Sequence, residues 1–286
     1  MRGTGLQPHA LLRHLHHLLS TIVDALASVV IAPACAVCDT LLDRPTAGPV
    51  CDACWSAIRP LTPPLCSVCG DPLPPTRGAR LSSPITESHD GFAVGELNPD
   101  PLVCRRCRGS RLIIARSRAI GEYSGTLRAA VHLLKYEKRR SMAPRLAAMM
   151  AVSGADVLHG ADAAVPVPLH WTRKWRRGFN QASLLAGNLG VCVWPALVRV
   201  RATSPQVDLT ADARRLNVRH AFAIARREWP WRRRWPARLK GQVVVLVDDV
   251  STTGATLEAC AEVLREAGAR EVRALTAARV VVAASR

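Results

Sequence analysis

Two kinds of apolar pattern alternate from about residue 116 to the end of the chain. Short runs rich in β-branched residues predict strands at 116–123, 163–166, 197–201, 220–225, 243–247 and 271–282. Apolar residues at helical spacing predict helices at 125–136 and 142–152, a third that opens at 177–181 and runs to about 190, and a fourth that ends at 268. Strands that alternate with helices in this way favour an α/β domain built on a parallel sheet.

The run at 243–247 is followed directly by residues whose side chains can bind a ligand. Asp248 and Asp249 come next, then a turn of hydroxyl residues and glycine over 251–256, and then a helical pattern. Such a turn offers backbone N–H groups at a helix N-terminus, which suits a phosphate. Open α/β sheets bind ligands where their strands end, so the two acids lie where a ligand is expected. A sugar phosphate satisfies both features, because Asp248 and Asp249 can accept hydrogen bonds from ribose hydroxyls, directly or through Mg²⁺. The alternative is that the acids cap a helix or pair with arginine.

The N-terminal segment is apolar without being a membrane span. Leucines and other apolar residues recur at helical spacing between 11 and 26, which predicts an amphipathic helix over 1–33 that packs on the next module. A basic start and Ala32–Cys35 faintly resemble an export signal, but histidine and arginine interrupt the apolar run. No run reaches the 18 apolar residues that a transmembrane helix needs, and we expect a cytoplasmic protein.

Eight of the ten cysteines form four Cys-x-x-Cys pairs, which predicts zinc. Each turn directs two thiolates at one ion, and two turns complete a Cys₄ site. Sequential pairing gives one site from the first two pairs and one from the last two, and interleaved pairing is the alternative. Disulfides would need an exported protein, and a redox dithiol would need one pair rather than four. We expect one or two structural zinc ions bound by Cys35, Cys38, Cys51, Cys54, Cys66, Cys69, Cys104 and Cys107.

These pairs define a small module at 34–112, with a Pro-, Ser- and Gly-rich insertion at 71–103. A closed Cys₄ site has no open coordination position, so its role is structural rather than catalytic. The two remaining cysteines, Cys192 and Cys260, lie in apolar or helical contexts and are expected to be small core residues.

A net charge of +17 and a pI near 10.6 imply a polyanionic partner: nucleic acid, a phosphorylated small molecule or an anionic surface. An arginine-rich composition reduces the weight of this argument. Arginine and tryptophan alternate most densely at 171–177 and 226–240. Such segments can stack bases and neutralise phosphates of single-stranded DNA, or they can be surface insertions with buried tryptophans.

Four features occur in one order along the chain: the Cys-x-x-Cys module, V-P-V-P-L at 165–169, R-R-G-F-N-Q at 176–181, and L-V-D-D-V-S-T-T-G-A-T at 246–256. Together they resemble the ComF family of phosphoribosyltransferase-like proteins, which is known from natural competence for DNA uptake. The resemblance implies a type I phosphoribosyltransferase core at 113–286, preceded by a zinc ribbon. It also implies phosphoribosyl pyrophosphate (PRPP) with Mg²⁺ as the ligand.

The resemblance implies roles for residues that match the family's strings. Phosphate and ribose would be bound by Asp248, Asp249, Ser251, Thr252, Thr253, Gly254, Ala255 and Thr256. The pyrophosphate loop would be Val165, Pro166, Val167 and Pro168, and a flexible loop over the site would carry Gln206 and Arg214. The catalytic set would be Asp248, Asp249, Arg177 and Lys135, because cationic side chains stabilise the charge on departing pyrophosphate. For Asn180 we favour capping of the helix that follows.

Two functions fit these observations. The first is a phosphoribosyltransferase, a pentosyl (glycosyl) transferase that moves ribose-5-phosphate between PRPP, or another ribose-5-phosphate compound, and an acceptor. It would act in DNA uptake or in nucleotide and nucleoside metabolism. The alternative is a non-catalytic or PRPP-sensing competence factor that binds single-stranded DNA. The sequence identifies no acceptor pocket, no general base and no oligomeric state.

Overall fold

The computed structural model describes residues 33–74, 102–109, 112–169, 175, 178–201, 220–225 and 235–281. Several predictions lie outside these residues. They are the N-terminal helix, most of the insertion at 71–103, Arg177, the loop residues Gln206 and Arg214, and residues 226–234 of the second Arg/Trp segment. Among the described residues, no helix is long and apolar enough to cross a membrane.

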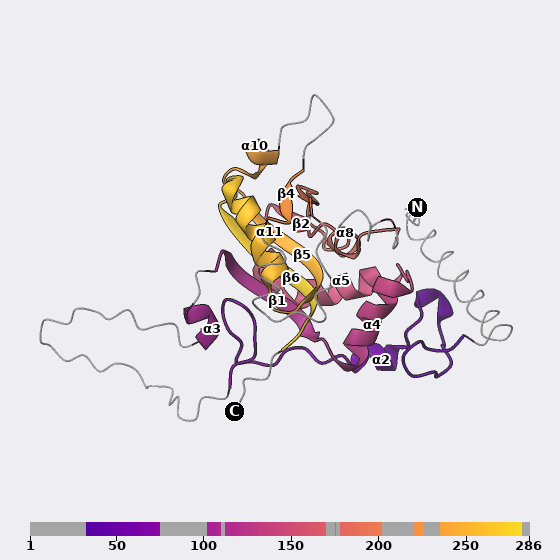
Figure 1. Cartoon of the computed structure of the whole chain (residues 1–286). Helices are drawn as coiled ribbons and strands as arrows, with labels where there is room; N and C mark the ends of the chain where they lie inside the picture. The colour runs from indigo at the N-terminus through magenta and orange to yellow at the C-terminus, as the bar shows by residue number, and fades with distance from the viewer. Residues whose placement is uncertain are drawn as a thin grey trace, which may run out of the picture.

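A four-stranded parallel sheet forms the centre of the fold. Its order is β1 (Ile114–Glu122), β6 (Glu271–Arg279), β5 (Val243–Ser251) and β2 (Ala163–Pro166). Helices cover both faces (Figure 1), so the first part of β5, 243–247, is buried on both sides and is continuously apolar. The edge strand β1 and its neighbour β6 also contain charged residues. The predicted α/β class with a parallel sheet is confirmed.

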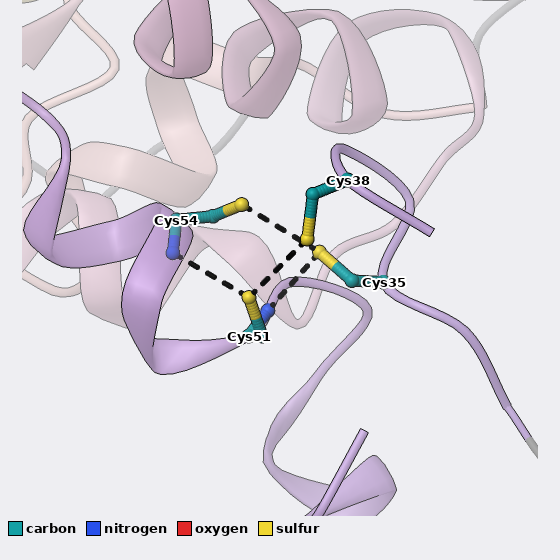
Figure 2. A group of neighbouring side chains, drawn as sticks. All are labelled: Cys35, Cys38, Cys51 and Cys54. Atoms are coloured by element: carbon teal, nitrogen blue, oxygen red, sulfur yellow. Dashed lines mark hydrogen bonds between the residues drawn. The ribbon is translucent and has the colours of Figure 1, made fainter. Parts of the chain in front are cut away.

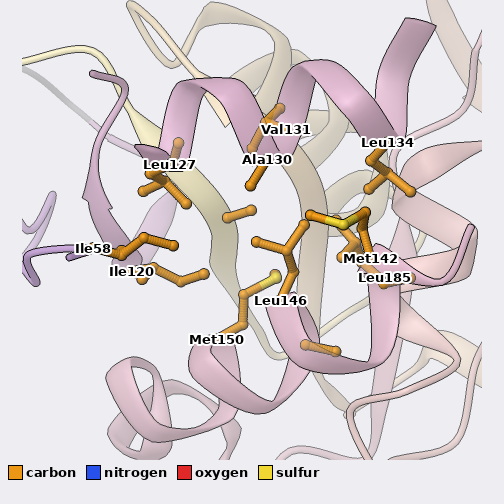
Figure 3. Close-up of a cluster of buried hydrophobic side chains, with 14 of the residues drawn as sticks. Ile58, Ile120, Leu127, Ala130, Val131, Leu134, Met142, Leu146, Met150 and Leu185 are labelled. Carbon is orange, nitrogen blue, oxygen red and sulfur yellow. The ribbon is translucent and has the colours of Figure 1, made fainter. Parts of the chain in front are cut away.

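One face of the sheet is covered by α4 (Gly125–Tyr136), α5 (Met142–Ser153) and α8 (Gln181–Ala186). The short helix α6 (Ala155–Leu158) follows α5 directly. Figure 3 shows the core on this side, where Ile120 from β1 meets Leu127 and Val131 of α4 and Leu146 of α5. Apolar residues three or four apart in each helix form the stripe that packs against the sheet.

The opposite face is covered by α11 (Ala255–Glu266), the short helix α10 (Trp235–Leu239) and an antiparallel pair, β3 (Leu197–Arg199) with β4 (Phe222–Ile224). Trp235 and Trp194 are buried there, and the Arg238 guanidinium lies over both rings. Trp235 belongs to the second Arg/Trp segment. For this residue the structure therefore favours the buried alternative over base stacking.

The cysteine-rich part forms two ribbons that lie on different sides of β1 (Figure 1). The first ribbon (33–58) contains the 3₁₀ helix η1 (Pro45–Ala47) and α2 (Asp52–Ser56), and it packs beside α4. The second ribbon (64–74 and 102–109) contains α3 (Arg105–Arg108) and lies against the first half of β1.

Several element boundaries differ from the predictions. β5 does not end at the two acids but continues to Ser251, because Val250 and Ser251 still pair with Ala278 and Arg279 of β6. The helix after Asn180 ends at Ala186 rather than near 190. Three strands are shorter than their apolar runs: β3 ends at 199, β4 spans 222–224 and β6 ends at 279. The pair β3–β4 stands apart from the parallel sheet.

Candidate functional site

Two carboxylates near the end of β5 point to opposite faces of the sheet, because successive side chains of a strand alternate. Asp249 faces α4, where its Oδ1 accepts a hydrogen bond from Lys135 Nζ at 2.9 Å. Asp249 is 8 % exposed, and Lys135 lies in the last turn of α4. Asp248 faces α11, and the positive charge of Arg199 from β3 acts on it electrostatically. The structure thus brings together three of the four residues predicted to be catalytic.

The electrostatics of these three groups are linked. Burial raises the pKa of Asp248 to about 7, and the neighbouring charge of Asp249 acts in the same direction. Lys135 opposes this shift, as does the hydrogen bond that Asp248 Oδ1 accepts from the Asp249 backbone N–H at 2.8 Å. Burial works against the charge of Lys135, but the attraction of Asp249 and then Asp248 outweighs it and raises the pKa of the lysine. The site therefore contains a partly buried ammonium group beside two carboxyl groups. The carboxyl groups can accept hydrogen bonds or bind a cation.

A glycine-containing turn joins β5 to α11, and we call residues 251–256 the candidate phosphate turn. Gly254 has φ +79°, a left-handed conformation that glycine adopts without strain. The N-cap residue of α11, Gly254, has no side chain to cap the helix, and the first N–H of the helix, that of Ala255, donates to Thr253 Oγ1 at 3.4 Å. The helix N-terminus at this turn is the kind of place where proteins bind phosphate. Ser251 and Ala255 are buried, while the three threonines and Gly254 are partly buried.

The predicted pyrophosphate loop lies beside the acids. Val165 and Pro166 pair with Leu246 and Val247 of β5, and the Val167 N–H donates to the Val247 carbonyl at 2.9 Å. Pro168 follows at the end of this ladder and is partly buried. The carboxyl ends of β2 and β5 are therefore adjacent, as a single ligand spanning them would require.

The N-terminus of α8 supports this loop. The Asn180 side chain accepts from the Ala182 N–H at 3.1 Å, which is the cap that the sequence predicted. The same side chain donates to the Val167 carbonyl at 2.9 Å. Gln181 is buried and its Nε2 donates to the Lys135 carbonyl at 3.5 Å. The R-R-G-F-N-Q string therefore connects the loop to Lys135, a role for Gln181 that the sequence reading did not assign.

Three charged residues of the site region were missed from the sequence. Arg199 acts on Asp248 from β3, and Arg140 lies over the ring of Phe179 at 4.8 Å. Arg279, at the end of β6, is 3 % exposed and pairs with Asp71 of the second ribbon. Each comes from an ordinary strand end or loop, and no local pattern distinguishes it from a solvated surface arginine.

The first four cysteines converge on one point (Figure 2). Their sulfur atoms lie within 4.8 Å of one another, with Cys35 Sγ and Cys54 Sγ 3.9 Å apart and Cys38 Sγ and Cys51 Sγ 3.6 Å apart. Tetrahedral coordination at a Zn–S distance of about 2.3 Å places sulfurs about 3.8 Å apart, so the four residues fit zinc. Hydrogen bonds from the side chain and backbone of Thr40 lower the pKa of Cys38 to about 6, which favours the thiolate.

The last four cysteines form a second group of the same kind. Cys69 Sγ and Cys104 Sγ lie 3.7 Å apart, and all four sulfurs lie within 4.8 Å. Burial opposes ionisation of Cys66, but backbone N–H groups of Cys104 and Cys69 lower its pKa to about 7. The pairing is thus sequential, and the interleaved alternative is wrong. All ten cysteines are free of disulfides.

The second ribbon includes residues 71–73, which the sequence places in the insertion at 71–103. The Cys66 N–H donates to the Asp71 carbonyl at 2.8 Å, and the Leu73 N–H donates to the Pro64 carbonyl at 2.8 Å. These bonds close the turn around Cys66 and Cys69. Residues 71–73 are therefore structural parts of the second cysteine site.

A parallel α/β sheet with two acids and a glycine turn at the carboxyl end of β5, joined to two Cys₄ groups, is typical of a phosphoribosyltransferase-type domain with zinc ribbons. Family models agree with this class. A double zinc ribbon domain matches residues 26–86, and a phosphoribosyl transferase domain matches residues 196–282. The two Cys₄ groups in a double zinc ribbon support structural zinc.

Curated relatives narrow the class to a family. DNA utilization protein YhgH of Escherichia coli K12 is 32% identical over 238 residues, which cover 77% of this chain and 93% of that protein. Competence protein F of Haemophilus influenzae is 35% identical over 168 residues, which cover 54% of this chain and 68% of that protein. The chain belongs to this ComF/YhgH family. A solved structure described as the allosteric regulatory enzyme of purine biosynthesis aligns at 23% identity over 47% of this chain and 25% of that chain, with a TM-score of 0.30, and carries no weight here.

Proposed function

We propose that this protein binds PRPP with Mg²⁺ at the carboxyl end of β5 and transfers ribose-5-phosphate to or from an acceptor. One observation carries the proposal. Asp249, which pairs with Lys135 at 2.9 Å, lies on β5 just before the candidate phosphate turn, and β5 pairs with β2, the strand that leads into the Val165–Pro168 loop. A ligand with a phosphate, a ribose and a pyrophosphate would have partners in all three places.

Each group has a distinct task in this proposal. N–H groups of the candidate phosphate turn bind the 5′-phosphate, and Asp248 and Asp249 accept hydrogen bonds from the ribose hydroxyls. The C1–O bond breaks, pyrophosphate leaves with the electron pair, and the acceptor nucleophile forms the new bond to C1. Mg²⁺ bound with PRPP would neutralise charge on the departing pyrophosphate.

The Lys135 side chain would occupy two positions in succession in this mechanism. In the structure its Nζ is held by Asp249. When ribose hydroxyls occupy the carboxylate, the ammonium group becomes free to pair with pyrophosphate at the adjacent Val165–Pro168 loop. Electrostatic stabilisation of the charge that develops in the transition state is usually the largest contribution to catalysis.

The test is calorimetric titration of PRPP with Mg²⁺ into wild type and into the double variant Asp248→Ala/Asp249→Ala. We expect an affinity loss of about 100-fold or more, which corresponds to about 3 kcal/mol. Asp43→Ala, an exposed aspartate of the first ribbon, serves as control and should bind like wild type. If the double variant retains wild-type affinity, the assignment of the site is wrong. Release of pyrophosphate in the presence of candidate acceptors then decides whether turnover occurs.

A second candidate is a PRPP-sensing factor that binds single-stranded DNA. Trp175 is 87 % exposed, Tyr136 is also exposed, and Lys138, Arg139 and Arg140 follow Tyr136. Exposed aromatics among cations suit stacked bases and a phosphate backbone. Relatives named for DNA utilization and competence agree with this partner.

Binding of a single-stranded oligonucleotide over a salt series tests this second candidate. The affinity should fall steeply between about 50 and 200 mM salt, and it should fall further in Trp175→Ala/Tyr136→Ala. An affinity that does not change with salt would exclude the basic surface as a nucleic-acid site. Eight reduced zinc-ligating cysteines suit a reducing compartment, and we infer a cytoplasmic location for either activity.

A further inference from the structure

The backbone from Pro166 to Pro168 has no free N–H group for a phosphate. The two prolines carry no N–H. Val167, between them, donates its N–H to the Val247 carbonyl of β5 at 2.9 Å. A phosphate group placed at this part of the loop therefore has to be bound by side chains or by a cation that accompanies the ligand.

The Val167 carbonyl is a second polar group of the same stretch. A carbonyl oxygen carries partial negative charge, so it repels a phosphate placed beside it. In the structure this oxygen accepts a hydrogen bond from Asn180 Nδ2 at 2.9 Å. The side chain of Asn180 thus satisfies the acceptor and reduces its repulsion of an anion at the loop.

The orientation of the Asn180 amide is fixed by its two partners. Its Oδ1 accepts the Ala182 N–H at 3.1 Å, while its Nδ2 donates to the Val167 carbonyl. Exchange of oxygen and nitrogen in this amide would place two donors together at Ala182 and two acceptors together at Val167. Capping of α8 needs only the amide oxygen. The bond to the loop is therefore a second task of the same side chain.

Helix α8 gives this bond a fixed base. Leu185 and Ala186 of α8 lie in the same hydrophobic cluster as Val245 and Val247 of β5. Asn180 directly precedes the helix, so its side chain ties the loop to an element that the core holds in place. The loop is thus attached at two points, to β5 through its backbone and to α8 through Asn180.

The neighbours of Asn180 contact two cationic residues. Gln181 is 1 % exposed, and its Nε2 donates to the backbone carbonyl of Lys135 at 3.5 Å. The guanidinium of Arg140 lies over the ring of Phe179 at 4.8 Å. The segment 179–181 therefore contacts both the loop and residues whose side chains can supply the positive charge that the loop backbone lacks.

We propose that Asn180 is a positioning residue for the pyrophosphate group of the ligand. It acts through Val167 and does not touch the ligand itself. This inference rests on the proposed function, because it assumes a ligand that carries a pyrophosphate. In that function the ribose and the 5′-phosphate are bound by the acids of β5 and the candidate phosphate turn. Loss of the bond between Asn180 and Val167 should therefore affect only the pyrophosphate part of the ligand.

The test is calorimetric titration of three probes, each with Mg²⁺, into the zinc-loaded full chain: PRPP, inorganic pyrophosphate and ribose-5-phosphate. Asn180→Ser keeps an oxygen that can cap α8 but lacks the amide group that reaches Val167. It should weaken binding of PRPP and of pyrophosphate about tenfold each, and change binding of ribose-5-phosphate by less than about twofold. Its melting temperature should stay close to that of wild type, which separates the loop bond from the cap.

Asn188→Ser is the matched control. The exposed Asn188 side chain donates to the Leu184 carbonyl at 2.8 Å, which is the same kind of bond beyond the C-terminal end of α8. This variant should bind all three probes like wild type. Asn180→Thr, which also retains a capping oxygen, replaces Asn180→Ser in the test should the serine variant fail to fold.

Two results would overturn the inference. One is wild-type affinity of the Asn180 variant for both PRPP and pyrophosphate. The other is an equal loss of affinity for all three probes, because that would reflect general damage to the site. A wild-type protein that binds neither PRPP nor pyrophosphate would instead contradict the proposed function, so the same titrations distinguish the two failures.

Discussion

The two zinc ribbons have the same ligand set but are attached to the α/β domain in different ways. The first ribbon contributes Leu42, Trp55 and Ile58 to the same hydrophobic cluster as α4, α5 and the sheet. Figure 3 shows Ile58 next to Ile120 of β1 inside that core. The second ribbon instead has a small apolar cluster of its own, in which Val68 and Leu73 pack around its cysteines.

Directional contacts attach the second ribbon. The Ser117 N–H of β1 donates to the Val68 carbonyl at 2.6 Å, and Arg118 donates to the Ser67 carbonyl at 3.2 Å. A Cβ on Gly70 would lie 2.7 Å from the Ser117 carbonyl oxygen, so the close approach to β1 requires glycine. Asp71 reaches Arg279 at the end of β6. Apolar burial is non-directional and stabilises, whereas these contacts fix a position. We infer that the first ribbon stabilises the domain, whereas the second fixes the position of β1 and of the end of β6.

Removing one zinc ligand from each ribbon should break this comparison most clearly. Cys54→Ser and Cys107→Ser should each reduce bound zinc from about two ions to about one per chain. Cys54→Ser should lower the melting temperature of the α/β domain by about 10 °C or more, because its ribbon is part of the domain core. Cys107→Ser should lower it much less. Metal analysis with thermal unfolding measures both, and equal losses of stability would contradict the distinction.

Truncation of apolar contacts should give the next largest difference. Trp55 is buried in the shared core with the Arg145 guanidinium over its ring at 5.0 Å. Trp55→Ala should reduce the free energy of unfolding by about 3–5 kcal/mol, measured by denaturant titration. Val68→Ala in the second ribbon, which is only partly buried, should cost about 1 kcal/mol. A cost for Val68→Ala as large as that for Trp55→Ala would show that the second ribbon is also part of the stabilising core.

Ion pairs in the two ribbons should contribute differently to the free energy of unfolding, measured by the same denaturant titration. Asp71→Ala leaves the buried Arg279 guanidinium without its carboxylate, and it should cost about 2–3 kcal/mol. In the first ribbon, Asp52 pairs with Arg44 and Arg145 at the surface. Asp52→Ala should leave the unfolding midpoint nearly unchanged, since exposed pairs contribute little. The reverse order of effects would place the positioning contact in the first ribbon.

The smallest expected effect is a pH dependence that neither ribbon should alter. The pKa of Asp248 is raised to about 7, above its ordinary value near 3.8, so the folded protein holds a proton there that the unfolded chain has lost. The contribution of this group to stability therefore decreases as pH rises through that window. Ribose hydroxyls need the carboxylate as acceptor, so PRPP affinity should rise by at most about tenfold per pH unit up to about pH 7 and then level off. Asp248→Asn should remove the dependence.

In Cys107→Ser the inflection should stay near the same pH, because burial and Asp249, rather than the ribbon, cause the shift. Calorimetric titration of PRPP over a pH series measures it. A moved inflection would mean that the second ribbon also controls the electrostatics of β5.

Local patterns predicted the elements whose signals are complete within a few residues. The bounds of α4 and β2, Gly125–Tyr136 and Ala163–Pro166, agree with the predicted 125–136 and 163–166. The Asn180 cap is likewise a local matter of one side chain and an N–H two residues on. The end of β5 was missed because its last residues are held by pairing with β6, which no pattern within β5 encodes.

By itself, the sequence determined the α/β class, the two sets of four cysteines that suit zinc, and the string of acids, hydroxyls and glycine at the end of β5. These depend on periodicity and on short spacings, which act along the chain. Only the tertiary structure decided which cysteines share an ion, that Lys135 meets Asp249 across 114 residues, and that Asp71 meets Arg279 across 208. Such contacts depend on how whole elements pack. The shared core of the first ribbon is a consequence of that packing alone.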